Sequence, residues 1–318
     1  MFYLIQGTEI KMIGYEFIDP EEQLTSNDFC FVESFLKETG RTQLGWHYIT
    51  DLTWIYSRVN NWSRNLKILD AGGGHGPVQF LLAEMGFHVT NIDMALFEPP
   101  TAYCDRYQIN LKTLPSFKPT SYKEFISTEK GNISFGRVLK NLVKQTSLYK
   151  FCNSRYYTAS HSKWRSSTHL SDVSLGSIQW TIGNLCKMPE IPSGQFDAVV
   201  SLSAWEHIPY QDLDVALAEI SRVLKPDSLW AVTTSGTEQP GTWWHDQSQS
   251  NCFSISDLEK HFGAKKQRVQ NPAEILDKYR RCSYLKQNLA EFYKKSDKFG
   301  MPLGIWEPRY IPVGLSSL

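Results

Sequence analysis

The apolar residues of the chain form short runs, separated by turns or by segments with helical spacing. Five runs have the length and the Ile, Val and Leu content of buried strands: 67–69, 87–92, 178–182, 196–202 and 229–234. Helical spacing follows the first run, at 77–85, and separates the last two, at 213–224. This alternation of strands and helices predicts an α/β fold with a doubly wound, mostly parallel sheet.

Both ends of the chain are expected to add helices to this sheet. Apolar residues recur at helical spacing over 27–61, before the first strand, and a helical stretch is predicted at 272–298. A strand-like segment covers 309–315. We therefore expect one domain over residues 1–318, with an N-terminal helical segment and a C-terminal helical insertion.

The longest break in the alternation lies between the second and third predicted strands. Residues 94–176 span 83 positions there, where one helix and two loops would normally suffice. Within them a stripe of apolar residues follows helical spacing: Phe135, Val138, Leu139, Leu142 and Val143. We predict a large insertion that caps the carboxyl edge of the sheet, with an active-site loop at 235–252 along the same edge.

The composition excludes a mainly disordered chain, because 41% of the residues are hydrophobic and 17 Phe, 15 Tyr and 10 Trp can fill a core. Lys plus Arg and Asp plus Glu both total 33, which disfavours a uniformly basic nucleic-acid-binding protein. The neutral total hides an asymmetry. Residues 94–176 contain 12 basic and five acidic residues, a net charge of +7, so the remainder carries −7.

Cysteine spacing and hydropathy indicate the cellular compartment in which the protein is expected. The six cysteines lie at least 30 residues apart without a CxxC pair, which is typical of reduced thiols. No apolar run approaches the roughly 20 residues that cross a bilayer, and the first 20 residues lack the apolar core of a signal peptide. We expect a cytoplasmic protein without a transmembrane segment; its oligomeric state is left open. The scattered histidines show no metal-ligand spacing, so no metal site is predicted.

A glycine-rich turn follows the first predicted strand. After Asp70, Gly72 allows a sharp turn, Gly74 allows a ligand to approach the backbone, and Gly76 precedes a helix whose free N–H groups can meet polar ligand atoms. The dinucleotide fingerprint GxGxxG fails here, because Pro77 stands where its third glycine would be. Asp93 ends the next strand, where a carboxylate can accept both ribose hydroxyls.

These segments resemble the motifs of class I S-adenosylmethionine-dependent methyltransferases, in particular the small-molecule type. The matching segments, in order, are 68–76, 89–93, 183–189, 196–209 and 222–226. The resemblance implies a Rossmann-like fold and S-adenosyl-L-methionine as cofactor. It implies that Asp70 and the glycines face the methionine part and Asp93 the ribose, while Asn184 with Leu185 contacts the adenine.

Two further residues are expected at the cofactor because of their positions: Met94 directly after Asp93, and Ser203 after the fourth strand. The sequence departs from the family pattern at Asn184, where the family usually has Asp; an amide oxygen can still accept from the adenine amine. It also departs at 227–228, where Asp-Ser replaces the usual Gly-Gly and should affect a turn rather than the chemistry.

Three residues are candidates for acid–base catalysis, because a hydroxyl or ammonium substrate must lose a proton. His207 is the first choice as base, because it follows the fourth strand at the substrate-facing edge; alternatively, it is a helix-start histidine bonded to a backbone carbonyl. Glu206 is its neighbour, and the two cannot both point into the cleft. His245 lies in the loop with Trp243 and Trp244, which either wall a pocket or anchor the loop to the core. Weaker candidates are His47, Tyr48, His161 and His169.

We expect methyl transfer to oxygen, with nitrogen as the less favoured atom, on a small polar molecule such as a sugar or specialised metabolite. The basic insertion suggests an anionic substrate, although Arg137, Lys140 and Lys144 also fit a solvated helix face or a membrane-surface helix. The alternatives are a non-catalytic S-adenosylmethionine-binding regulatory protein, an RNA or protein methyltransferase that uses the basic insertion, and a nicotinamide dehydrogenase. Nucleic acid is disfavoured, because Ser203-Ala204-Trp205-Glu206 replaces the Asn-Pro-Pro-Tyr type of motif.

Overall fold

The computed structural model describes residues 12–95, 101–117, 163–297 and 300–318. Within these ranges nine strands form one sheet: β1 (Ile13–Phe17), β2 (Lys67–Ala71), β3 (His88–Asp93), β4 (Asn110–Thr113), β5 (Ser177–Ile182), β6 (Phe196–Leu202), β7 (Leu224–Gly236), β10 (Lys265–Lys266) and β11 (Ile311–Ser317). Their order across the sheet is β10-β1-β11-β7-β6-β2-β3-β5-β4.

The central strands run parallel to one another. β7, β6, β2, β3, β5 and β4 pair in parallel, whereas β11 is antiparallel to both of its neighbours, β7 and β1. From β2 the chain first builds outward through β3 and β5, then returns to place β6 on the other side of β2. The predicted doubly wound, mostly parallel α/β fold is confirmed.

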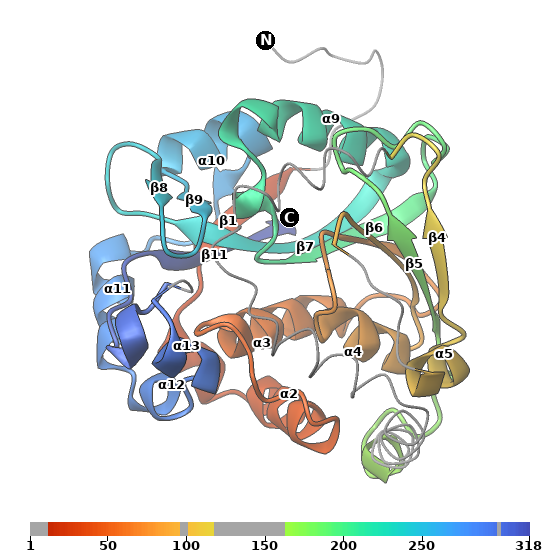
Figure 1. Cartoon of the computed structure of the whole chain (residues 1–318), viewed down its shortest axis with the longest axis horizontal. Coiled ribbons are helices and arrows are strands. Elements are labelled where there is room, and N and C mark those ends of the chain that lie inside the picture. The colour runs from red at the N-terminus through yellow and green to blue at the C-terminus, as the bar shows by residue number, and fades with distance from the viewer. Residues whose placement is uncertain (1–11, 96–100, 118–162, 298–299) are drawn as a thin grey trace, which may run out of the picture.

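Helices cover both faces of the sheet (Figure 1). On one face lie α9 (Leu213–Val223) and α10 (Ile255–Phe262); on the other lie α2 (Asn27–Glu38), α3 (Tyr48–Val59) and α4 (Val78–Glu84). The buried apolar residues accordingly form two clusters, one for each face. The remaining helices are short: α1 (Pro20–Leu24), α5 (Thr101–Tyr107), α11 (Pro272–Arg281), α12 (Ser283–Gln287) and α13 (Glu291–Lys295).

The structure differs from the sequence-based expectations in several segments. Residues 27–61 form two helices with an irregular link, and 272–298 contains three short helices instead of one long one. The expected loop at 235–252 contains a hairpin of β8 (Trp243–His245) and β9 (Ser250–Cys252). Strands β1, β4 and β10 were not expected.

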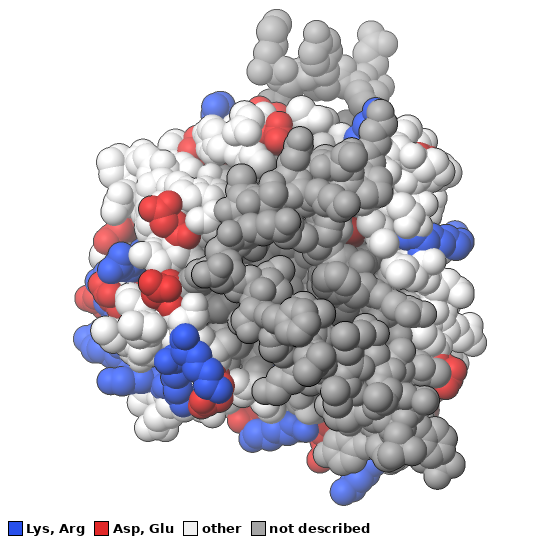
Figure 2. Space-filling model, viewed as in Figure 1, with Lys and Arg blue, Asp and Glu red and all other residues white. Residues whose placement is uncertain are grey.

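The predicted insertion at 94–176 is only partly described. Its first part forms α5 and β4, and β4 extends the main sheet as an edge strand paired with β5. Strand β4 is therefore part of the main sheet, and the cap expected from the rest of 94–176 stays a prediction. Residues 96–100 and 118–162, which include the apolar stripe at 135–143 and His161, lie outside the described residues. Over the described part of the face in Figure 2, acidic and basic side chains are interspersed.

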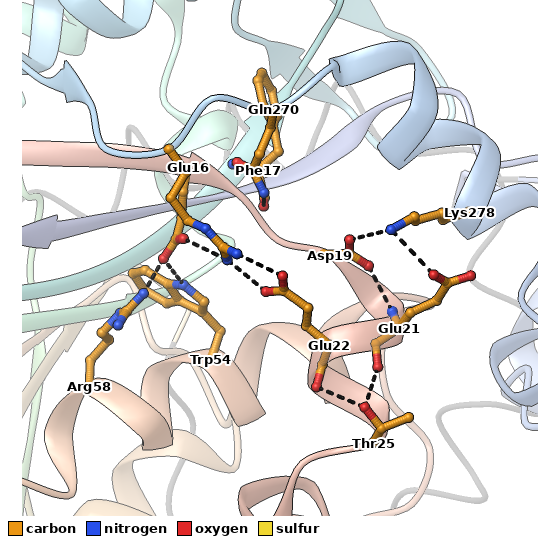
Figure 3. Close-up of polar contacts among 11 residues, drawn as sticks. Glu16, Phe17, Asp19, Glu21, Glu22, Thr25, Trp54, Arg58, Gln270 and Lys278 are labelled. Atoms are coloured by element: carbon orange, nitrogen blue, oxygen red, sulfur yellow. Dashed lines mark hydrogen bonds and ion pairs between the residues drawn. The ribbon is translucent and has the colours of Figure 1, made fainter.

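Ion pairs attach the N-terminal segment to the sheet (Figure 3). Glu16 of β1 is buried, accepts a hydrogen bond from Trp54 Nε1 (2.8 Å) and pairs with Arg58 of α3. Arg268, after β10, pairs with both carboxylate oxygens of Glu22 at 2.6 and 2.7 Å and approaches Glu16 Oε2 at 3.5 Å. The network joins three segments that are distant in sequence: β1 with α1, helix α3, and the residues after β10.

A second buried carboxylate connects α4 to the described parts of 94–176. Glu84 is fully buried, and its Oε1 accepts from Arg106 Nε (2.8 Å) and from the Tyr107 hydroxyl (2.9 Å). Its Oε2 pairs with Arg165 at 2.9 Å. Removing the charge of a buried partner is costly, because the guanidinium groups stay buried without compensation.

We therefore predict that Glu84→Gln lowers the free energy of unfolding by about 3 kcal/mol. Urea titration followed by circular dichroism measures the loss. Glu33→Gln is the matched control, since Glu33 pairs with Lys37 at the surface and should change stability by less than about 1 kcal/mol. A Glu84→Gln loss no larger than that of the control would show that this ion-pair cluster does not hold the segments together.

Candidate active site

The carboxyl ends of β2, β3 and β6 form the candidate site. The chain reverses its direction of winding between β2 and β6, and ligands of open α/β sheets bind outside the carboxyl ends of the strands at such a point. Ala71, Asp93 and Leu202 are the last residues of these three strands. The predicted glycine turn follows Ala71 directly.

The turn is shaped by two glycines. Gly72 has φ +84°, a left-handed conformation that favours glycine, and a Cβ there would lie 2.8 Å from the Cβ of Ala204. A Cβ on Gly73 would overlap with the carboxylate of Asp70. The backbone therefore lies directly over the Asp70 side chain, and any larger residue at Gly73 would have to displace it.

Asp70 is an acceptor without a donor. Its side chain is fully buried, and neither carboxylate oxygen has a hydrogen-bond partner among the described residues. Burial, with the nearby Asp93 as the second cause, raises the pKa of Asp70 to about 8. Because burial has removed water from this acceptor, the site favours a ligand that carries a hydrogen-bond donor.

Asp93 closes the other side of the turn. Its Oδ2 accepts from the Gly74 N–H at 2.9 Å, and its Oδ1 accepts from the Ala95 N–H at 2.7 Å. The intervening residue, Met94, is half-buried. Each carboxylate oxygen has a second lone pair, so Asp93 can still accept from a diol while it holds the turn.

Three buried polar side chains support the turn from below. Gln79 Nε2 and Asn91 Nδ2 donate to the Gly74 carbonyl at 3.0 and 2.6 Å. Trp180 Nε1 donates to Gln79 Oε1. Gly76 closes the loop, with its N–H donating to the Gly73 carbonyl at 2.8 Å. Sequence reasoning missed Gln79 and Asn91; the available signal was a polar residue on each otherwise apolar element beside the turn.

The segment after β5 contributes Leu185 to the site. Its Cδ1 lies 3.8 Å from the position of a Cβ on Gly72, so this side chain borders the turn. Asn184 Oδ1 accepts from the Cys186 N–H at 2.9 Å, which stabilises its own turn. The Asn184 amide oxygen, predicted to accept from the adenine amine, thus already accepts one hydrogen bond and keeps one lone pair free.

Ser203 connects the site to helix α3. It has φ +47°, which is uncommon for a residue with a side chain, and its N–H is held by Thr233 Oγ1 at 3.1 Å. Its hydroxyl donates to Asp51 Oδ2 at 2.9 Å. The same oxygen accepts from His47 Nδ1 at 3.0 Å, and both His47 and Asp51 are buried. His47, a weaker candidate from the sequence, thus lies beside the site, and Asp51 was missed because its partner is 152 residues away.

Glu206 and His207 point in opposite directions. Glu206 is buried, its oxygens accept from the hydroxyls of Thr234 (3.1 Å) and Ser235 (3.2 Å), and burial raises its pKa. His207 is exposed, with Nδ1 bonded to the Gln249 carbonyl at 2.9 Å. This corresponds to the alternative role given for His207, a histidine that binds a backbone carbonyl.

His245 lies buried in the β8–β9 hairpin. Its Nδ1 is 2.6 Å from Ser248 Oγ and accepts from the Ser248 N–H at 3.4 Å, and its Nε2 has no partner among the described residues. Burial lowers the pKa of His245, and the positive charge of Arg309 adds to this effect. Its ring packs against Tyr310 and Trp243, with centroids 5.4 and 5.5 Å apart.

The remaining candidates fall into two groups. Tyr48 is half-buried near Glu206 and Asp51, and its burial with these carboxylates raises its pKa. His169 instead contacts Phe31 and Tyr56 on the helical face and is not at the sheet edge.

Across the described ranges, no group of three or more His, Cys, Asp or Glu side chains could hold a metal ion. Nor is any helix in those ranges long and apolar enough to cross a membrane.

Comparisons with known proteins bear on this site. A family model described as a methyltransferase domain matches residues 135–232, which include β5, β6 and α9 but not the glycine turn. No curated protein matches the sequence.

Similar solved structures include a 1,6-didemethyltoxoflavin-N1-methyltransferase from Burkholderia thailandensis with bound 1,6-didemethyltoxoflavin and S-adenosylhomocysteine (13% identity, TM-score 0.41, 99% of this chain and 97% of that chain). A second is the [4+2]-cyclase SpnF (13% identity, TM-score 0.46, 95% of this chain and 97% of that chain). A third is a geranyl diphosphate methyltransferase in complex with GPP and sinefungin (12% identity, TM-score 0.39, 83% of this chain and 75% of that chain). At these identities and TM-scores, none of the three says what this chain binds or methylates. The family match shows that residues 135–232 are similar to a methyltransferase domain, and the order of the motifs along the sheet agrees with that similarity.

Proposed function

We propose that the chain moves the methyl group of S-adenosylmethionine to an oxygen atom, or less favourably a nitrogen atom, of a small polar molecule. The observation that carries the proposal is the buried carboxylate of Asp70, which has no donor and lies against Gly73. A cofactor with hydroxyl and ammonium donors fits such an acceptor and the open backbone above it.

The bound cofactor supplies an electrophilic methyl carbon, which a nucleophile takes by in-line displacement. The protein's part is to hold the reacting groups in line. Asp93 is positioned for the ribose by its bonds to the Gly74 and Ala95 N–H groups. Leu185 borders Gly72 and offers an apolar surface for the adenine.

His245 is our proposed general base. A base must be unprotonated and must have a free lone pair near the nucleophile. Burial lowers the pKa of His245, which keeps the ring neutral near pH 7, and Nε2 has no partner among the described residues. Nε2 carries the lone pair that accepts the substrate proton in the tautomer whose Nδ1–H donates to Ser248 Oγ; in that tautomer Nδ1 no longer accepts from the Ser248 N–H, 3.4 Å away. Glu206, also buried at this edge, is proposed to orient the substrate through its carboxylate.

The substrate is proposed to lie near Tyr48 and Glu206, which interact electrostatically, and near His245, whose ring packs against Trp243 and Tyr310. An anionic substrate would need the basic residues of 94–176, most of which lie outside the described residues. The aromatic rings and the buried Glu206 carboxyl favour a neutral or cationic group at the methylated end. A polar small molecule, such as a sugar or an amine-bearing metabolite, meets both conditions.

Cofactor binding should depend on Gly73. We predict that Gly73→Ala weakens S-adenosylhomocysteine binding at least tenfold, about 1.4 kcal/mol, because the new Cβ must displace the Asp70 carboxylate. Isothermal titration calorimetry measures the dissociation constant. Gly241→Ala is the control, since a Cβ there meets nothing within 4 Å. Equal affinity in Gly73→Ala and Gly241→Ala would rule out binding at this turn.

Turnover should depend on His245. Once a methylated product is found by incubating the protein with labelled S-adenosylmethionine and metabolite fractions, His245→Ala should reduce kcat about 100-fold or more while cofactor affinity is retained. In the wild-type protein the rate should fall only below pH 6.5, the ordinary histidine value, because the folded-state pKa is lowered and protonation removes the base.

His88→Ala serves as the control for that experiment. His88 is exposed at the amino end of β3, bonded to Ser177, and its loss should leave kcat unchanged. If His207→Ala abolishes turnover and His245→Ala does not, the base has been assigned to the wrong histidine. Tight S-adenosylhomocysteine binding without turnover of any fraction would instead favour a non-catalytic, cofactor-binding role.

A further inference from the structure

We propose that Asp51 binds an ammonium group of a ligand through its Oδ1, and that His47 and Ser203 are the residues that position it. The inference rests on the proposed function, because it concerns the same sheet edge. It adds a recognition residue that belongs to none of the family-like segments.

The two oxygens of Asp51 have different environments. The side chain is fully buried on α3, and Oδ2 accepts from both His47 Nδ1 (3.0 Å) and Ser203 Oγ (2.9 Å). Oδ1 has no hydrogen-bond partner among the described residues. A buried carboxylate oxygen without a donor destabilises the fold unless a ligand supplies the missing hydrogen bond.

The donors to Oδ2 form a chain that ends at Asp51. Trp46 Nε1 donates to the Tyr310 hydroxyl (2.9 Å), and Tyr310 lies 3.4 Å from His47 Nε2. Because the Tyr310 hydroxyl can donate to Nε2, the His47 proton lies on Nδ1 and faces the carboxylate. These donors orient Asp51 and leave its Oδ1 without a hydrogen-bond partner among the described residues.

No Lys or Arg within the described ranges forms an ion pair with Asp51; its partner there is His47. A second buried carboxylate, Glu206, interacts electrostatically with Asp51, and both act on Tyr48. Two buried acidic groups beside an aromatic ring make a site of negative potential. An ammonium group suits it, because it offers N–H donors, a compensating charge and an attraction to the ring face.

Ser203 places this acceptor at the functional edge. It follows β6 with φ +47°, and its neighbour Ala204 is in close contact with Gly72, whose added Cβ would lie 2.8 Å away. Strained backbone of this kind persists where the surroundings hold it, often at ligand sites. Oδ1 of Asp51 is therefore offered to a ligand bound beside the glycine turn.

Two ligands could bring the ammonium group: the amino-acid end of the cofactor, or an amine substrate. The test uses Asp51→Asn, which keeps the shape and removes the charge. S-adenosylhomocysteine carries the ammonium group, and 5′-methylthioadenosine lacks it, so their affinities are compared by calorimetry in wild type and variant. If the cofactor is the source, the variant should bind S-adenosylhomocysteine at least about tenfold more weakly and 5′-methylthioadenosine unchanged.

A second arm covers the substrate. Wild-type protein and Asp51→Asn are saturated with S-adenosylhomocysteine and heated with 2-phenylethylamine or with 2-phenylethanol, which has a hydroxyl in place of the ammonium group. If an amine substrate is the source, only the amine should raise the melting temperature of the wild type, and Asp51→Asn should abolish that increase.

Thr53→Val is the matched control, because Thr53 is buried on the same helix and its hydroxyl donates to the Ile49 carbonyl at 2.7 Å. It should bind every probe as the wild type does. Ser203→Ala should weaken the ammonium-bearing probe alone, by less than Asp51→Asn. The proposal is overturned if Asp51→Asn weakens both nucleosides equally, or if it changes neither nucleoside nor the amine response. Failure of the wild type to bind either nucleoside would instead remove the proposed function itself.

Discussion

The contact between the Asp70 carboxylate and the backbone of Gly73 is the constraint on which the rest of the site depends. It sets the direction in which the chain leaves β2 and keeps that backbone free of side chains. It also leaves a buried acceptor without a donor, with its pKa raised to about 8. The side-chain amides of Gln79 and Asn91 hold the turn in place by donating to the Gly74 carbonyl.

Helix α3 brings the second half of the site to this turn. Glu16 and Arg58 fix the helix against the N-terminal strand, and Asp51 on the same helix reaches Ser203 at the end of β6. The same helix thus carries a structural ion pair and the carboxylate that we propose to bind an ammonium group. In the proposed function, one half of the site holds the cofactor and the other faces the methyl acceptor.

Much of the architecture follows from local pattern. Buried strands such as β2 and β6 are short apolar runs in the sequence. The glycines at 72–76 indicate a turn whose backbone a ligand can approach closely. Strands β4 and β10 escaped prediction because their residues are exposed at the sheet edges and carry no apolar alternation. The long helix expected at 272–298 is interrupted, since the backbone is extended at Cys282 and again at Ala290.

By itself the sequence determined the class of fold, the glycine turn and the acidic residue that ends β3, because each depends on neighbours within a few positions. Only the tertiary structure decided which side chains meet at the sheet edge. Glu206 turns inward and His207 outward because Thr234 and Ser235 offer hydroxyls on one side and the Gln249 carbonyl lies on the other. Asp51 and Ser203 meet across 152 positions, and a contact that distant is set by packing, which no local pattern records.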